Sequence, residues 1–186
     1  MGTLAHVLQQ QIKISNLDAA RRQLQTAIEL WFHDKDPVSI HTLTMSAHQI
    51  VYDLNKKKKG PPLAFDADFV TPEYRKEANR LLKIPSNFFK HADRRQVADS
   101  IDFNPELSEG FILFTLRGLE FLGQPMSETE AAFTTWSLLN KPNMLSEEGR
   151  KRLIHPFPIE HLDELRAIPK KDFFEMFLAL KRKTAV

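Results

Sequence analysis

One short segment of the sequence brings together several side chains that could do acid–base chemistry. It reads Asn87-Phe88-Phe89-Lys90-His91-Ala92-Asp93. In a helix, Asn87 and His91 lie one turn apart on the same face, with Lys90 beside them. The charge of Lys90 would lower the pKa of the imidazole and keep it neutral, ready to accept a proton. The segment therefore predicts a candidate catalytic site at Asn87, Lys90 and His91. The alternative is a helix start whose polar groups only cap and solvate the backbone.

A second group of polar side chains shares one face of a predicted helix further upstream. His41, His48 and Tyr52 lie opposite the apolar stripe of that helix. His41 and His48 are about 10.5 Å apart along the axis, too far for one metal ion to bridge, because zinc–imidazole bonds are about 2 Å long. We interpret His41, His48 and Tyr52, together with Asp93, as candidate substrate- or partner-binding residues and assign no metal site. The alternative is a metal site that joins His41 or His48 to His91 and Asp93 across facing helices.

The order Asn-x-x-Lys-His-Ala at 87–92 resembles the polar box of HEPN-type helical domains. These small bundles usually dimerise, and many are ribonucleases or act in toxin–antitoxin and phage-defence systems. Their hallmark is an Arg followed within about six residues by His. Asn87 and His91 match the polar residue and the His of that pattern, and no Arg stands at the box. The resemblance implies a metal-independent ribonuclease or nucleotide-binding domain. In it, His91 would be the general base, Asn87 would position a phosphate or sugar, and Lys90 would offset developing charge.

Two segments taken together carry a second resemblance. The run 36–43, DPVSIHTL, and the box at 87–93 are similar to an uncharacterised family of bacterial helical proteins. That resemblance implies a shared lineage and an all-helical fold, and it brings no activity with it.

The rest of the chain predicts the helices that must position these groups. Hydrophobic spacing and capping residues predict helices at 17–32, 37–54, 72–82, 87–97, 105–122, 128–139, 159–166 and 170–183, with a further short one beginning at Ser146. Pro85 is expected to end one helix and Ser86 to cap the next. Asn16 is expected to cap the helix at 17–32, and Asp36 to cap the helix that begins at Pro37. Ser127 and Glu130, three residues apart, predict a capping box at the start of the helix at 128–139. Residues 1–15 are expected to be flexible and 55–70 to form a loop. The fold class is therefore all-α: one domain spanning 1–186, a bundle of about seven to eight helices with a long N-terminal helical hairpin.

Composition narrows the function classes. Of 186 residues, 42% are hydrophobic and 27% charged, which is typical of one globular domain. The net charge of +2 argues against a general polyanion binder. The absence of Cys excludes disulfides, thiolate nucleophiles and Cys-based zinc sites. No signal peptide and no membrane-spanning apolar run is recognisable, so we expect a cytoplasmic protein with no membrane partner.

The predicted helix at 105–122 is apolar nearly all round, which is typical of a central helix or an oligomer interface. No complete catalytic constellation accompanies it. We therefore favour a non-enzymatic, homodimeric or partner-binding helical protein without a cofactor. The two alternatives are the HEPN-like ribonuclease or nucleotide-binding domain, with RNA or a nucleotide as partner, and the metal-binding bundle.

Overall fold

The computed structural model describes residues 11–65, 71–91, 99–141 and 162–184 of the chain. These residues form helices and no strand, which confirms the all-α fold class. The helices are α2 (Asn16–Phe32), α3 (Pro37–Lys57), α4 (Pro72–Lys90), α5 (Leu107–Phe121), α6 (Glu128–Asn140), α8 (Leu162–Ala167) and α9 (Lys170–Thr184). The short helix expected from Ser146 lies outside the described residues. None of the described helices combines the length and apolar composition needed to cross a membrane.

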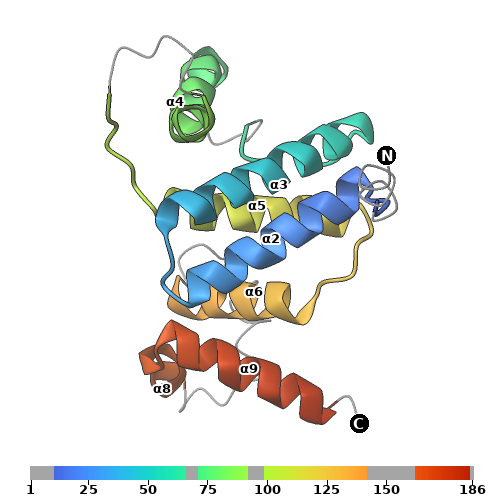
Figure 1. Ribbon diagram of the computed structural model, residues 1–186, viewed down its shortest axis with the longest axis vertical. Helices are drawn as coiled ribbons and strands as arrows, with labels where there is room; N and C mark the ends of the chain where they lie inside the picture. The colour runs from blue at the N-terminus through green and yellow to red at the C-terminus, as the bar shows by residue number, and fades with distance from the viewer. Residues whose placement is uncertain (1–10, 66–70, 92–98, 142–161, 185–186) are drawn as a thin grey trace, which may run out of the picture.

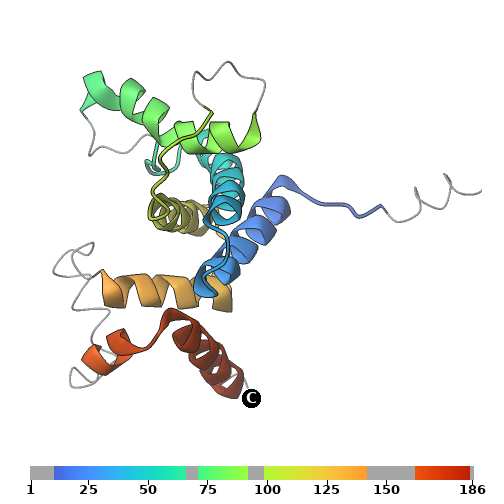
Figure 2. The ribbon, with the colours of Figure 1, turned by 60° about the vertical axis from the view of Figure 1, so that its left-hand side comes forward.

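The helices stack in layers, with α3 and α5 side by side at the centre (Figure 1). Helix α2 packs along α3 and also reaches α6, and α6 in turn carries α8 and α9 at one end of the molecule. Helix α4 crosses over α3 at the opposite end, seen almost end-on in Figure 1 and lengthwise in Figure 2. The apolar helix of the sequence is thus α5, and it is central within this chain.

Local capping explains where three of the helices begin. Ser127 and Glu130 form the capping box expected at the start of α6, each side chain bound to the backbone N–H of the other. The Asp36 carboxylate accepts from the N–H of Ser39 at 2.8 Å and starts α3, with Pro37 in its first turn. Helix α2 begins one residue earlier than expected, because Ser15, rather than Asn16, is its N-cap.

Helix α4 corrects one prediction. Pro85 was expected to end a helix and Ser86 to start another, but α4 runs through both residues to Lys90. Both are buried. Packing of this part of α4 against the rest of the bundle offsets the hydrogen bond that a proline inside a helix cannot make. Residues 87–90 are helical as expected, but they form the last turn of α4 and not a separate helix, and His91 ends α4 in an extended conformation. The rest of the expected helix, 92–97, lies outside the described residues.

The segment after α3 also differs from its expected loop. Helix α3 continues three residues beyond the predicted end, to Lys57. The side chain of Asn55 then donates to the carbonyl of Pro61 at 2.9 Å, which turns the chain back over the bundle. Leu63 and Phe65 are buried as a result. This return segment covers one side of α3 and α5.

An aromatic cluster joins the outer helices to the centre. Trp31 makes edge contacts with Phe133 and Trp136 at centroid distances of 4.9 Å. Phe32 stacks on Phe174 at 4.4 Å with only 10° between the ring planes. Phe174 and its neighbour Phe173 are the buried α9 side chains of the main core.

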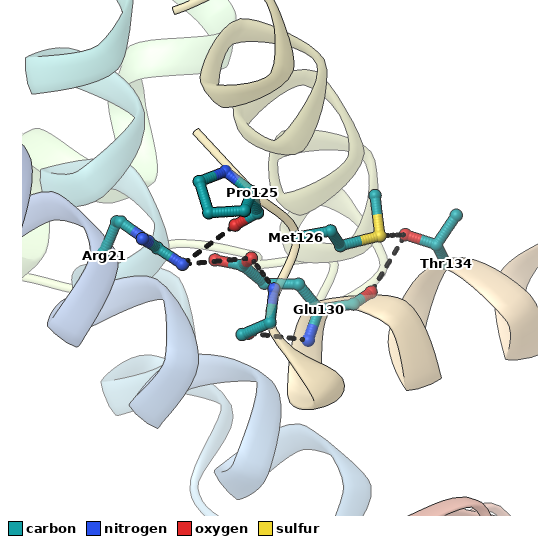
Figure 3. A network of polar contacts seen from close by, with 6 residues as sticks. Arg21, Pro125, Met126, Glu130 and Thr134 are labelled. Carbon is teal, nitrogen blue, oxygen red and sulfur yellow. Dashed lines mark hydrogen bonds and ion pairs between the residues drawn. The ribbon is translucent and has the colours of Figure 1, made fainter. Parts of the chain in front are cut away.

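A buried ion pair ties α2 to the start of α6 (Figure 3). The Arg21 guanidinium lies 3.8 Å from the Glu130 carboxylate and donates to the carbonyl of Pro125 at 3.0 Å. The side chain of Glu130 is only 2% exposed, whereas that of Arg21 is 25% exposed. The same carboxylate closes the capping box with Ser127, so a single group fixes both the cap and the helix contact.

Candidate functional site

The two predicted histidines of α3 lie in the core between α3 and α5. His48 is fully buried, and its Nδ1 lies 3.0 Å from the hydroxyl oxygen of Thr115. The Thr115 hydroxyl donates its own hydrogen to the carbonyl of Phe111 at 2.6 Å. Because a hydroxyl has one hydrogen, Thr115 must accept from His48. The neutral His48 ring therefore carries its proton on Nδ1 and leaves Nε2 as a bare acceptor.

His41 makes the matching contact one heptad earlier. It is also fully buried, and its Nδ1 lies 3.1 Å from the hydroxyl of Ser108. Both histidine–hydroxyl pairs are separated by 67 residues. An equal offset at two positions means that α3 and α5 run in the same direction with a fixed register. We call these two contacts between the parallel helices, His41–Ser108 and His48–Thr115, the histidine rungs.

Aromatic rings enclose both imidazoles. His48 packs edge-on against Phe65 at 5.1 Å and Phe111 at 5.0 Å. His41 packs against Phe103 at 4.9 Å and against Phe111 at 6.2 Å. Phe111 is thus shared by the two sites, and it fills the space between them. Tyr52, the third predicted binding residue of this face, is partly buried and packs at 6.3 Å from His48.

The surroundings strongly favour neutral imidazoles. Burial, together with a smaller contribution from the nearby Lys90 ammonium, lowers the pKa of His41 from 6.5 to about 4. Burial likewise lowers the pKa of His48 to about 4, with a second contribution from Lys83. Each imidazole therefore has a hydroxyl of α5 on one side and a positive charge of α4 nearby. At neutral pH neither imidazole carries a charge.

Both rings also keep one nitrogen without a hydrogen-bond partner. These are the Nε2 atoms of His41 and His48, and each is buried. A buried polar atom left unpaired costs about 1–3 kcal/mol. Since the rings are sealed by Phe side chains, a substrate at the molecular surface does not reach them. The structure therefore places His41 and His48 in the core, on the side of α3 that faces α5.

The predicted box lies at the far end of α4. Asn87 and Lys90 belong to the last turn, and the backbone N–H of His91 donates to the Asn87 carbonyl at 3.1 Å. The three residues are therefore close together along the chain, but His91 leaves the helix instead of standing on its face. Partial desolvation lowers the pKa of Lys90. Asp93 lies outside the described residues.

The box and the histidine face do meet at one point. Phe89, inside the box, contacts the His41 ring edge-on at 5.9 Å. Lys90 follows it and acts on the same imidazole. His48 lies one heptad away along α3, where Lys83 takes the corresponding place. The end of α4 is thus packed on the first rung only.

The geometry gives no metal-ligand set in the described part of the chain. There, no three side chains of His, Asp or Glu lie close enough together to hold one ion. His41 and His48 are each directed to a different hydroxyl of α5. The metal-binding hypothesis therefore has no ligand group among these residues.

The partners of the histidines could not be recognised from the sequence one residue at a time. Ser108 and Thr115 are small polar residues in a helix that is otherwise apolar. The signal that links them to the histidines is spacing: His41 and His48 are seven residues apart, and so are Ser108 and Thr115. Shared heptad spacing on two helices predicts side-by-side rungs once the helices are known to be parallel.

Comparison with known proteins adds no assignment, since no protein-family model, no curated protein and no solved structure matches this chain.

Proposed function

We propose that this protein acts by binding a partner rather than by catalysis, and that its first partner is a second copy of the same chain. The rungs support the non-catalytic part of the proposal. Among the histidines that the structure describes, His41 and His48 have a strongly lowered pKa, and both are buried in the core. Proton transfer to a substrate needs contact with it, directly or through one water molecule.

The observation that carries the dimer is an apolar groove at the α9 end of the molecule. The groove encloses about 320 Å³. It is lined by side chains of α6, α8 and α9, namely Thr135, Leu139, Leu165, Phe173, Met176, Phe177, Leu180 and Lys181. Leu180 stands at its edge with 56% of its surface exposed. The surface therefore carries both a recess and, beside it, an exposed leucine that could fill the same recess of a second copy.

A two-fold axis makes such a surface self-complementary. Helix α9 lies at the edge of the helix stack (Figure 1), so a second molecule can approach it without meeting the other layers. In an antiparallel pair of α9 helices, Leu180 of each copy would enter the groove of the other. The polar residues at the C-terminal end of α9, Lys181 to Lys183, would stay at the solvated rim.

The oligomeric state tests this proposal directly. We expect the full chain to sediment as a dimer at micromolar concentration and Leu180→Asp to sediment as a monomer with unchanged helix content. Leu81→Asp is the matched control, because Leu81 is similarly exposed at 52% but lies on α4. A monomeric wild type, or equal dissociation of both variants, would overturn the dimer through α9.

A second candidate function is RNA or nucleotide binding at the end of α4, as the HEPN resemblance implies. One observation favours it: Asn87, Lys90 and His91 lie within one turn, and Lys90 has a lowered pKa. In that function His91 would take the proton and Lys90 would face the phosphate. The test is cleavage of a mixed RNA by wild type and by His91→Ala at equal fold stability. RNA left intact by the wild type would exclude the ribonuclease.

We further propose a cytoplasmic location. The support is the absence of Cys, which suits a reducing compartment. Fractionation of cells that express the tagged chain checks it, and recovery from an exported or membrane fraction would contradict it.

A further inference from the structure

A second cavity lies at the other end of the molecule, between α4 and α5. It encloses about 340 Å³ and is lined by Ala64, Leu82, Asn104, Glu106, Leu107, Gly110, Phe111 and Phe114. Small-molecule sites are typically about 300–1,000 Å³, mostly apolar, with a few polar groups that set orientation.

Gly110 gives the first sign that the cavity has an occupant. A Cβ placed on Gly110 would meet no atom within 4 Å. Gly110 also lies inside α5, where glycine costs about 1 kcal/mol relative to alanine, and it is not among the glycines with positive φ. Neither packing nor backbone conformation requires a glycine here. The missing side chain instead lets a ligand approach the helix backbone.

Gly118 shows the contrast on the same helix. A Cβ there would lie 2.5 Å from a Val51 methyl group and 3.0 Å from Leu63. Close packing of α3 on α5 explains that glycine completely. Gly110 has no such explanation within the described residues.

The walls and mouth of the cavity define the chemistry of the occupant. Phe111 is held in place by the two histidine rungs, and with Phe114 it supplies flat apolar surface. At the mouth, Glu106 is exposed, and no cation among the described residues pairs with it. The Asn104 side-chain oxygen is already used by the N–H of Glu106 at 3.0 Å. Of the residues that line the cavity, the Glu106 carboxylate is the charged group, and the Asn104 amide N–H2 beside it can donate but cannot attract a cation.

We propose that this cavity binds a small aromatic amine, with its ring against Gly110, Phe111 and Phe114 and its ammonium group at Glu106. Aromatic rings pack favourably on Phe side chains, and a charged donor forms the stronger class of hydrogen bond with a carboxylate. The site is independent of the α9 dimer, since it lies on the opposite end of the helix stack.

Binding of 2-(1-naphthyl)ethylamine to the full chain tests the proposal by calorimetry or ligand-observed NMR. A ligand of this size with ordinary efficiency is expected to bind with a dissociation constant of about 1 mM or tighter. 1-Naphthylacetate, which has the same ring and the opposite charge, should bind at least about tenfold more weakly. No binding of the amine at 5 mM, about five times that value, or equal binding of the acid, would overturn the proposal.

Variants locate the site. Leu82→Trp should fill the cavity and abolish binding, whereas the neighbouring Leu81→Trp, whose side chain points to solvent, should bind as wild type does. Gly110→Ala should weaken binding several-fold while raising the melting temperature, a combination that a merely structural role does not produce. Glu106→Gln should weaken binding of the amine and leave binding of the neutral alcohol, 2-(1-naphthyl)ethanol, unchanged.

Equal binding of the amine by Leu82→Trp and by wild type would overturn the assignment. So would a dimer that dissociates only in Leu82→Trp, since the cavity would then be an interface between copies.

Discussion

His48 donates its Nδ1 hydrogen to Thr115 because the Thr115 hydroxyl has already given its own hydrogen to Phe111. This relationship fixes the tautomer of a buried ring that has no second partner. The site accepts a neutral imidazole and offers nothing to stabilise a charged one. His41 makes the corresponding contact with Ser108 one heptad away and is buried with a lowered pKa as well, so the central α3–α5 contact depends on both rings staying neutral.

The first prediction is loss of stability in mild acid. The folded-state pKa of each ring, about 4, lies below the unfolded value of 6.5, so the unfolded chain binds more protons between these values. The contribution of these two histidines to the free energy of unfolding should be constant above pH 6.5 and fall as the pH drops toward 4. Below pH 4 it should fall no further. The difference corresponds to at most about 3.5 kcal/mol per histidine, at about 1.4 kcal/mol per pKa unit. Urea unfolding at a series of pH values measures it.

The control for the acid effect is His48→Leu. Thr115 keeps its hydrogen bond to Phe111 in this variant, and the unpaired Nε2 is removed, so stability at pH 7 should change by less than about 1.5 kcal/mol. The pH dependence between 6.5 and 4 should become shallower, and shallower again in His41→Leu/His48→Leu. An unchanged slope in the double variant would assign the acid effect to other groups.

Much of the helix layout was predictable because its signals are local. The Ser127–Glu130 box and the Asp36–Pro37 entry each depend on residues within one turn, and both predictions are confirmed. Pro85 shows the limit of local rules. Its effect on the backbone is local, but its burial depends on helices distant in the sequence. That tertiary packing overrides the tendency of proline to end a helix, so α4 continues through Pro85.

The second prediction compares two glycines of α5. Gly118→Ala forces a methyl group against Val51 at 2.5 Å and should destabilise the fold by about 1–3 kcal/mol through overpacking. Gly110→Ala meets open space and should stabilise it by up to about 1 kcal/mol through helix propensity. Thermal unfolding of both variants beside wild type checks the opposite signs. Two changes of the same sign would contradict the packing of α5 described above.

The third prediction concerns the Arg21–Glu130 pair. Arg21→Met leaves the Glu130 carboxylate buried and unpaired, so we expect a loss of about 2–3 kcal/mol, less than for a fully buried pair because Arg21 is 25% exposed. Glu130→Gln keeps an acceptor for Ser127 and should cost less. The double variant should cost less than the sum of the single ones, because the two groups interact. Strictly additive losses, measured by urea unfolding, would show that the pair contributes no coupling energy.

The site was less predictable than the fold, for a related reason. The spacing of His41 and His48 correctly indicated a shared helix face, but whether that face is core or surface depends on α5, which lies more than sixty residues away in the sequence. In the box, the expected face formed by Asn87 and His91 depended on where α4 ends. The helix stops at Lys90, and His91 turns away from it.

The fourth prediction concerns how α9 is attached. Phe174 is 5% exposed and stacks on the fully buried Phe32, so Phe174→Ala should lower the free energy of unfolding by about 3–5 kcal/mol. Leu180→Ala, on the exposed side of the same helix, should change it by no more than about 0.5 kcal/mol in the monomer. Amide hydrogen exchange gives the sharper readout: in Phe174→Ala, α9 should lose protection before α3 and α5 do, because this ring is one of the two buried α9 side chains of the main core. Uniform loss of protection across all three helices would instead make α9 part of one cooperative unit with the central pair. In that case a mutation that dissociates the α9 dimer would be expected to destabilise the whole chain.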